Sequence, residues 1–206
     1  IQEDARNVRI FNNKLHDNDW HGIYVFAVGN SYPSDIRIFN NFIYSNKTSG
    51  IRVEKSTSVE ILNNSFYYNG EQYDGSGAAL SLNHAKAAGV VFINNAVYSS
   101  TAPAIRTVEG SSYSGNNNLL FTQKGPANII FHGKTYQLPE FIKAIGQDQN
   151  SKCANPRFAN AAKGNFNLDS SSPGIGKGQV LNDKFTSDHA GTVRGDIWDI
   201  GAYEQP

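Results

Sequence analysis

The residues best suited to chemistry in this sequence are aromatic and charged side chains in two polar stretches near its start and in the segments that follow them. Residues 17–21 read Asp-Asn-Asp-Trp-His, and residues 69–77 read Asn-Gly-Glu-Gln-Tyr-Asp-Gly-Ser-Gly. An aromatic ring stacks on the C–H face of a sugar, while carboxylate, amide and guanidinium groups bond its hydroxyls. This mixture predicts a surface that binds a neutral sugar chain. The candidate sugar-binding residues are Asp19, Trp20, Tyr24, Arg52, Glu54, Glu71, Tyr73 and Arg106.

These residues are embedded in an internal repeat. The phrase IRIFNNFIYSN at residues 36–46 returns in altered form from Val8, Val59 and Val90, at intervals of 23 to 31 residues. Each copy alternates apolar and polar residues, as a strand does, and then carries two asparagines. A repeat this short, rich in Val, Ile, Phe, Asn and Gly, predicts one coil of a parallel β-helix rather than a helix pair. The asparagine pairs are Asn12-Asn13, Asn40-Asn41, Asn63-Asn64 and Asn94-Asn95.

A second repeated sequence alternates with the first along the chain, and part of the candidate site lies in it. Its apolar positions are Ile23, Ile51, Leu80 and Ile105, which we expect to point inward. Because successive side chains of a strand point to opposite faces, the residues that follow them form an outward row. That row is Tyr24, Arg52, Ser81 and Arg106. An asparagine cluster at residues 116–118 predicts a fifth coil.

Two further features of the repeat have structural interpretations. The paired asparagines suit corners, where they tolerate left-handed backbone and bond the equivalent residue one coil away. A second outward row, His16, Tyr44, Tyr67 and Tyr98, is either an aromatic ladder or an alternative sugar-binding surface. A third row, Phe11, Phe39, Leu62 and Ile93, requires a cover, which we expect from the segment after residue 123, with Phe141 and Ile142 as the candidates.

Composition limits the class of partner. The chain has 206 residues, with 18 basic and 18 acidic side chains, and its hydrophobic content is 39%. The charge balance indicates neither nucleic acid nor a membrane surface as partner. A single cysteine, Cys153, excludes disulfides within the chain. The sequence begins at Ile1 and has no transmembrane run, so we expect a module of a longer, exported protein.

After Gln123 the register of the repeat is lost. Residues 138–146 predict a short helix, with Pro near its start and Gly at its end. The loop-rich remainder contains NPRF from Asn155, NFNL from Asn165, SSPGIGKG from Ser171, D-x-x-G-x-x-R from Asp188 and DIGAYE from Asp199. We therefore expect one all-β domain, with coils at residues 1–122 and closing coils, helix and cap at 123–206.

These closing phrases, in this order, resemble the end of bacterial right-handed parallel β-helix proteins of the pectate-lyase-like superfamily. The resemblance implies that Asp188, Arg194 and Asp199 form a buried polar cluster that caps the coils. Many such proteins are exported and act on polysaccharides. The chain lacks the acidic calcium cluster of pectate lyases and the Lys/Arg motif of alginate lyases. In fold and length it is most similar to the small β-helical carbohydrate-binding modules (family 89 type) appended to bacterial xylanases.

The resemblance implies a non-catalytic, monomeric module that binds a plant cell-wall polysaccharide, with xylan first, outside the cell and without cofactor or metal. The alternative is an enzyme on the same surface, a truncated polysaccharide lyase, epimerase or glycoside hydrolase. A glycosidase requires two carboxyl groups at a defined separation, one of them protonated. Asp19, Glu54, Glu71 and Asp74 supply the residue types. A third class is a structural segment of a surface adhesin.

Overall fold

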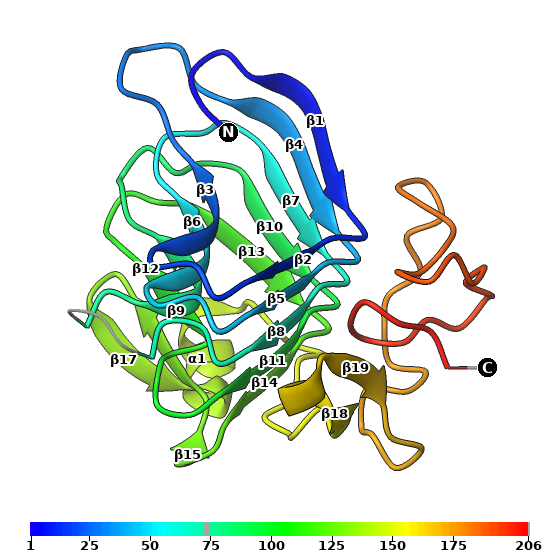
Figure 1. Cartoon of the computed structure of the whole chain (residues 1–206). Helices are drawn as coiled ribbons and strands as arrows, with labels where there is room; N and C mark the ends of the chain where they lie inside the picture. Colours follow the sequence, from blue (N-terminus) through cyan, green and yellow to red (C-terminus); the bar gives the residue numbers. More distant parts are fainter. Residues whose placement is uncertain (72–74, 206) are drawn as a thin grey trace.

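Three sheets wind around one core in the computed structural model, which describes residues 1–71 and 75–205 (Figure 1). Each of the five coils in the described part contributes one parallel strand to each sheet. Two short antiparallel strands, Gly125–Pro126 and Lys134–Gln137, extend the second and third sheets at the last coil. All strand pairs between coils are parallel. The chain is therefore a parallel β-helix, as the repeat predicts.

The strands of each sheet follow one another at regular steps along the chain. Sheet 1 contains β1 (Arg6–Phe11), β4 (Ser34–Phe39), β7 (Val59–Leu62), β10 (Val90–Ile93) and β13 (Tyr113–Asn116). Sheet 2 contains β2 (Lys14–His16), β5 (Phe42–Tyr44), β8 (Ser65–Tyr67), β11 (Ala96–Ser99), β14 (Leu119–Thr122) and β15 (Gly125–Pro126). Sheet 3 contains β3 (His21–Val25), β6 (Ser49–Val53), β9 (Ala78–Leu82), β12 (Ile105–Thr107), β16 (Asn128–Phe131) and β17 (Lys134–Gln137).

The register of sheet 3 confirms the predicted faces. Ile51 pairs with Ile23 and Leu80, and these inward side chains are almost wholly buried. The last coil continues past Gln123, where the sequence pattern loses its register. The β14–β15 hairpin follows, and β16 then stacks on β12 in parallel register, which completes the fifth coil.

The asparagines turn the chain between sheets 1 and 2, as predicted. The first of each pair has positive φ, between 48° and 59° for Asn40, Asn63 and Asn94. The second asparagines form a ladder along the helix axis, which is buried at Asn41, Asn64 and Asn95. Asn64 Nδ2 donates to Asn95 Oδ1 at 3.1 Å, and Asn64 Oδ1 accepts from Asn41 Nδ2 at 3.0 Å. A second ladder, not predicted, joins Asn18, Asn46 and Asn69 between sheets 2 and 3.

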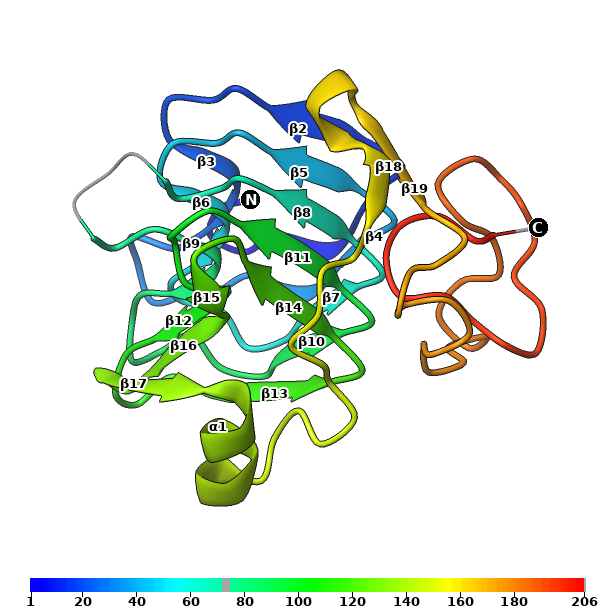
Figure 2. The same cartoon turned by 90° about the horizontal axis from the view of Figure 1, so that it is seen from below.

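The helix α1 (Leu138–Ile145) covers the last coil (Figure 2). Its Glu140 carboxylate accepts the Gln137 N–H at 3.3 Å, and Gly146 ends the helix with a φ of 78°. Phe141 is fully buried against the core at this end. Phe141 therefore caps the end of the coil stack, and the prediction that Phe141 and Ile142 cover the Phe39 row is wrong.

The cover over that row comes from later in the chain. Phe185 stacks on Phe39 with ring centroids 4.6 Å apart, and Leu181 and Trp198 are buried beside them.

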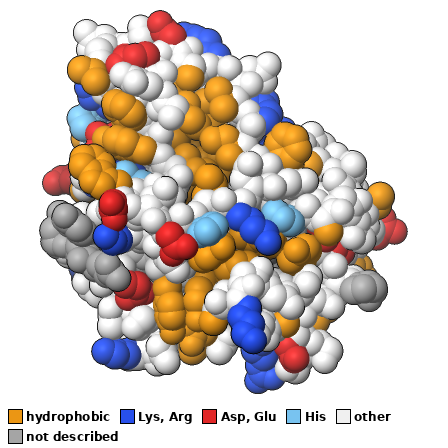
Figure 3. Space-filling view, in the orientation of Figure 1, with side chains coloured by type: hydrophobic (Ala, Val, Ile, Leu, Met, Phe, Trp, Pro, Cys, Tyr) orange, Lys and Arg blue, Asp and Glu red, His pale blue; other side chains and the backbone are white. Residues whose placement is uncertain are grey.

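Hydrophobic side chains gather over the first coil, at the top of the view in Figure 3. They include the partly buried Val8, Ile10 and Leu15 and the half-exposed Phe11.

The C-terminal segment runs along the side of the coils, next to the asparagine corner (Figures 1 and 2). It includes β18 (Phe158–Asn160), the 3-10 turn Ala161–Lys163 and β19 (Asn165–Leu168). Asn40, Asn63 and Asn94 donate side-chain hydrogen bonds to its carbonyls. The segment is thus held by the same asparagines that turn the chain.

The predicted polar cluster of Asp188, Arg194 and Asp199 is buried. Arg194 pairs with Glu204 at 2.6 Å, whereas the two aspartates accept backbone N–H groups, Asp188 from Thr192 and Asp199 from Gly176. The cluster lies against the side of the coils at Asn40 and does not cap their end. Its role is to fold the irregular segment back onto the asparagine corner.

Candidate functional site

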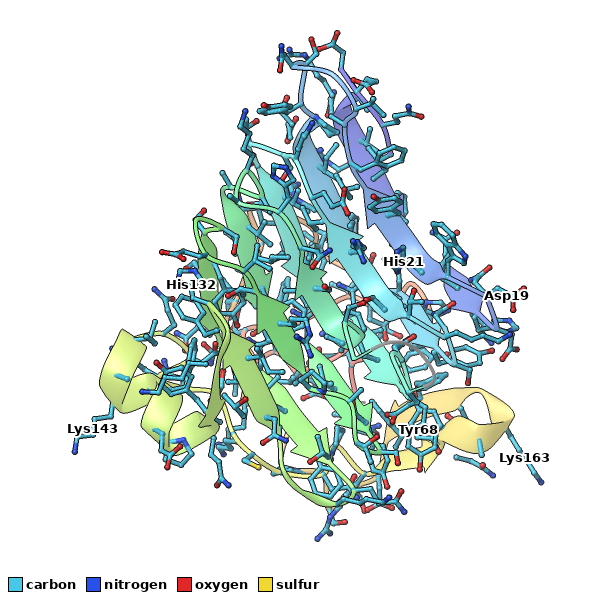
Figure 4. The ribbon with its side chains drawn as sticks, turned by 90° about the vertical axis from the view of Figure 1, so that its left-hand side faces the viewer. Asp19, His21, Tyr68, His132, Lys143 and Lys163 are labelled. Carbon is cyan, nitrogen blue, oxygen red and sulfur yellow. The ribbon has the colours of Figure 1, made fainter. Side chains whose placement is uncertain are left out.

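Aromatic side chains form a strip along β3, the first strand of sheet 3. Ring centroids of Trp20 and His21 are 6.1 Å apart, those of His21 and Tyr24 are 5.1 Å apart, and those of Tyr24 and Phe26 are 4.3 Å apart. The Trp20 side chain is 68% exposed. His21 and Asp19 lie at the edge of the sheet that faces the viewer in Figure 4. The strip is an apolar, ring-bearing surface at the first coil.

A charged pair lies beside this strip on the next coil. Arg52 Nη2 donates to Glu54 Oε1 at 2.7 Å, and the Arg52 guanidinium carbon lies 5.9 Å from the centroid of the Tyr24 ring. Partial burial and then the Glu54 carboxylate raise the pKa of Tyr24 to about 12. Tyr24 therefore keeps its proton at neutral pH. We call Trp20, His21, Tyr24, Phe26, Arg52 and Glu54 the Tyr24 surface.

His21 is neutral in this surface. Burial and then the positive charge of Arg52 lower the pKa of His21 to about 4. Its Nδ1 shares a hydrogen bond of 2.6 Å with Thr48 Oγ1. A neutral imidazole next to Tyr24 leaves Arg52 and Glu54 as the charged groups of the Tyr24 surface.

The low pKa of His21 predicts a loss of stability in mild acid. The unfolded chain takes up the His21 proton near pH 6.5 and the folded chain only near pH 4, so stability falls as pH falls through this window. We expect His21 to account for about 1 kcal/mol, less than the full shift because the group is half exposed. Urea unfolding of wild type and His21→Gln at pH 7 and pH 4.5 measures it. An equal loss in both proteins would contradict the prediction.

The register of sheet 3 aligns the predicted outward row, in which Ser81 is wholly buried. Arg52 pairs with Tyr24 and Ser81, and Arg106 pairs with Ser81 and Ile130. Arg106 therefore lies two coils beyond Arg52, about 10 Å at the usual strand spacing. It lines a separate hollow of about 480 Å³ together with Asn83 and His132.

The remaining predicted residues are placed elsewhere. Asp19 pairs with Lys47 at the corner between sheets 2 and 3. The Glu71 carboxylate accepts the backbone N–H groups of Ser100 and Thr101 at 2.6 and 3.0 Å, so it holds a loop of the next coil. Tyr73 and Asp74 lie outside the described residues. The Tyr24 surface thus unites Trp20, Tyr24, Arg52 and Glu54, but not the whole predicted set.

The outward row of sheet 2 is partly covered. His16 stacks on Tyr44 with ring centroids 4.4 Å apart. Phe166 of the C-terminal segment lies against Tyr44 and Tyr67, at 5.1 and 6.1 Å. Tyr98 continues the row beyond this cover. The row is an aromatic ladder in its first coils and open to solvent only in part.

A cleft that sequence reasoning missed lies at the corner between sheets 2 and 3. It measures about 540 Å³, and its lining includes Ser45, Lys47, Tyr68, Glu71, Thr101 and Lys124. These residues come from four successive coils. Tyr68 has a φ of 51°, a left-handed conformation uncommon for a bulky side chain. In the sequence, Tyr68 aligns with Asp17 and Ser45, which form the same corner in the two preceding coils. This alignment could have pointed to the cleft.

Comparison with known sequences identifies the family. Residues 1–123 match the model of the right-handed β-helix region. The chain belongs to this right-handed β-helix family. No curated protein and no solved structure matches the chain. Right-handed β-helix proteins often bind or act on polysaccharides, and they include enzymes and non-enzymes.

The sequence offered four carboxylates of this β-helix protein for catalysis. Those that the structure describes all have hydrogen-bond or ion-pair partners. Asp19 and Glu54 pair with Lys47 and Arg52, and Glu71 is bound by backbone N–H groups. A glycosidase acid has a raised pKa, which an adjacent cation opposes.

Within residues 1–71 and 75–205, no three His, Cys, Asp or Glu side chains are grouped as metal ligands. No helix in these ranges has the length and apolarity to cross a bilayer.

Proposed function

We propose that this chain is a non-catalytic carbohydrate-binding module that recognises a plant cell-wall polysaccharide, with xylan as first candidate. It would hold an appended glycoside hydrolase on its substrate outside the cell. The observation that carries the proposal is the exposed aromatic strip from Trp20 to Phe26 beside the Arg52–Glu54 pair.

The Tyr24 surface has the parts that sugar recognition uses. The strip presents flat ring surface to the C–H faces of a sugar chain, and Trp20 adds an exposed indole at one end. Arg52 and Glu54 hold each other at 2.7 Å, so their remaining donors and acceptors are oriented before a ligand arrives. A paired cation and anion add no net charge, which suits a neutral backbone such as xylan.

Loss of Trp20 is the direct test of this surface. Trp20→Ala should weaken binding to xylan about thirtyfold or more, the usual cost of removing an aromatic residue that dominates a binding surface. The melting temperature should stay within about 2 °C, because Trp20 is 68% exposed and little core packing is lost. Affinity electrophoresis in gels containing xylan, β-glucan, mannan or polygalacturonate measures binding, and calorimetry measures stability.

The matched control is Ile197→Ala, which removes another exposed hydrophobic side chain, 70% exposed, from the C-terminal segment. Its binding should equal that of wild type. Equal binding by Trp20→Ala and wild type would place the site elsewhere. Release of reducing ends or of unsaturated sugars during the assay would make the chain an enzyme, and no retardation by any glycan would favour a structural role.

A further inference from the structure

The corner between sheets 2 and 3 holds a second group of aromatic, charged and hydroxyl side chains of the kinds that bind ligands. The cleft at Tyr68 has a volume of about 540 Å³, within the range that accommodates small ligands. Four coils contribute to its wall, at successive steps of about 4.8 Å, comparable with the length of one sugar unit. We call it the Tyr68 cleft. It is separate from the Tyr24 surface, which lies on the outer face of sheet 3.

Tyr68 occupies a position whose backbone favours smaller residues. In the first two coils the same corner is made by Asp17 and Ser45, which share its positive φ of 51° to 56°. Asp tolerates left-handed backbone far better than Tyr. Strain of this kind persists where the side chain has a use. Tyr68 lines the cleft, and its ring lies against those of Tyr67 and Tyr98, with centroids 4.2 and 5.6 Å apart.

Hydrogen bonds of Glu71 join two coils in the wall of the cleft. Glu71 accepts three backbone N–H groups, from Ser100, Thr101 and Ala102, and also the Thr101 hydroxyl. These donors fix the position of the Glu71 carboxylate and tie the loop at residues 100–102 to the coil that carries Tyr68.

Among the described residues, the charged side chains that line the cleft are Lys47, Glu71 and Lys124. Lys47 is paired with Asp19, and Glu71 is bound by N–H groups. Lys124 has no ion pair among the described residues, although it lines the cleft. An ammonium group beside an aromatic platform suits a sugar ring that carries a carboxylate, because the ring stacks while the carboxylate meets the cation.

We propose that the Tyr68 cleft is a second carbohydrate-binding site, which takes a sugar unit bearing a carboxylate, with Tyr68 as platform and Lys124 as its cation. The inference rests on the proposed function and narrows its ligand to a plant polysaccharide with acidic side groups. The Tyr24 surface would bind the neutral backbone, and the Tyr68 cleft would bind the acidic substituent.

Two polymers that differ only in charge test the assignment. Affinity electrophoresis is run with glucuronoxylan and with the same glucuronoxylan after reduction of its carboxyl groups. Lys124→Gln should weaken binding to the acidic polymer about tenfold, the value of one charge-assisted contact, and change binding to the reduced polymer less than about twofold. The matched control is Lys143→Gln, which makes the same charge change on α1, away from Tyr68 (Figure 4).

Tyr68→Asn separates a binding role from a structural one. Asparagine tolerates the left-handed corner, so the melting temperature should stay within about 3 °C of wild type while affinity for both polymers falls. A structural role for the ring would instead lower the melting temperature and leave the affinity of the folded protein unchanged, which overturns the assignment of Tyr68.

The outcomes separate this inference from the function on which it rests. Equal binding by Lys124→Gln and Lys143→Gln, with wild type still retarded, overturns the acidic site and leaves the module intact. Normal binding by Trp20→Ala with weakened binding by Lys124→Gln supports the Tyr68 cleft and overturns the Tyr24 surface. A wild-type protein that binds neither polymer overturns both proposals.

Discussion

Asn64→Ala should lower the free energy of unfolding by about 3–5 kcal/mol and the melting temperature by about 10 °C. Asn64 is wholly buried in the ladder between sheets 1 and 2. Its Nδ2 donates to the Ile38 and Leu62 carbonyls and to Asn95 Oδ1, at 2.9 to 3.1 Å. Alanine removes all these contacts and leaves the buried Asn41 N–H without the Asn64 Oδ1 that accepts it at 3.0 Å. A buried group left without a partner costs about 1–3 kcal/mol, and the other lost hydrogen bonds add to this cost.

Asn13→Ala is the matched control for this prediction. Asn13 begins the same ladder, donating to Asn41 Oδ1 at 3.2 Å, but its side chain is exposed. Water replaces the lost contacts there, so we expect a loss of about 1 kcal/mol or less. Urea unfolding of the two variants compares them directly. Equal losses would mean that the ladder does not owe its stabilising effect to burial.

The coils were predictable because the same physical demand recurs in each. Every corner requires a residue that accepts left-handed backbone, as Asn40 and Asn63 do. It also requires a neighbour whose side chain bonds the next coil, as Asn41 and Asn64 do. Inward positions such as Ile51 and Leu80 follow from alternation alone. These regularities predicted the faces of sheet 3, and with them the neighbourhood of Tyr24, Arg52 and Arg106.

For the segment after the coils, the sequence shows which residues must be buried, but not where on the coils they pack. Phe141 and Phe185 are both apolar residues that must be buried, and sequence order does not tell which covers the end of the coils and which covers the side. The difference lies in long-range contacts, such as the stacking of Phe185 on Phe39. A repeat pattern carries no information about contacts made by a segment that does not repeat.

The Tyr68 cleft was missed for a related reason. Its wall combines corner residues of successive coils with loops of unequal length, including the loop that carries Glu71. Alternation assigns strand residues to faces, but it does not place a corner or a loop. The sequence offered Glu71 as a sugar contact from a loop, but it did not indicate that the Glu71 carboxylate accepts the N–H groups of Ser100 and Thr101.

Arg194→Leu should lower the free energy of unfolding by about 3–5 kcal/mol, because it leaves a buried carboxylate without its cation. Arg194 donates to Glu204 at 2.6 Å and to the Gly201 carbonyl at 3.0 Å, and its side chain is buried. Burial raises the pKa of Glu204, while the Arg194 charge opposes this rise. Without arginine, we expect the pKa of Glu204 to rise further.

The sign of the pH effect follows from that rise. A carboxyl group whose pKa is higher in the folded state than in the unfolded chain favours folding at low pH, and this contribution is lost as pH rises through the folded pKa. Arg194→Leu should therefore be closer to wild type at pH 5 than at pH 7.5. Urea unfolding at the two pH values measures the difference, and an unchanged difference would contradict the role of Glu204.

Two further variants isolate the buried pair. Arg9→Leu removes an arginine paired with Asp35 at 3.0 Å on the surface, and should cost less than about 1 kcal/mol. Arg194→Leu combined with Glu204→Leu should be more stable than Arg194→Leu alone, because no unpaired charge remains buried. Arg194→Leu alone should also loosen the C-terminal segment from Asn40. Limited proteolysis should then cut this segment after the coils, while residues 1–123 persist. Cleavage within the coils first would show that the pair stabilises the whole β-helix rather than the attachment of this segment.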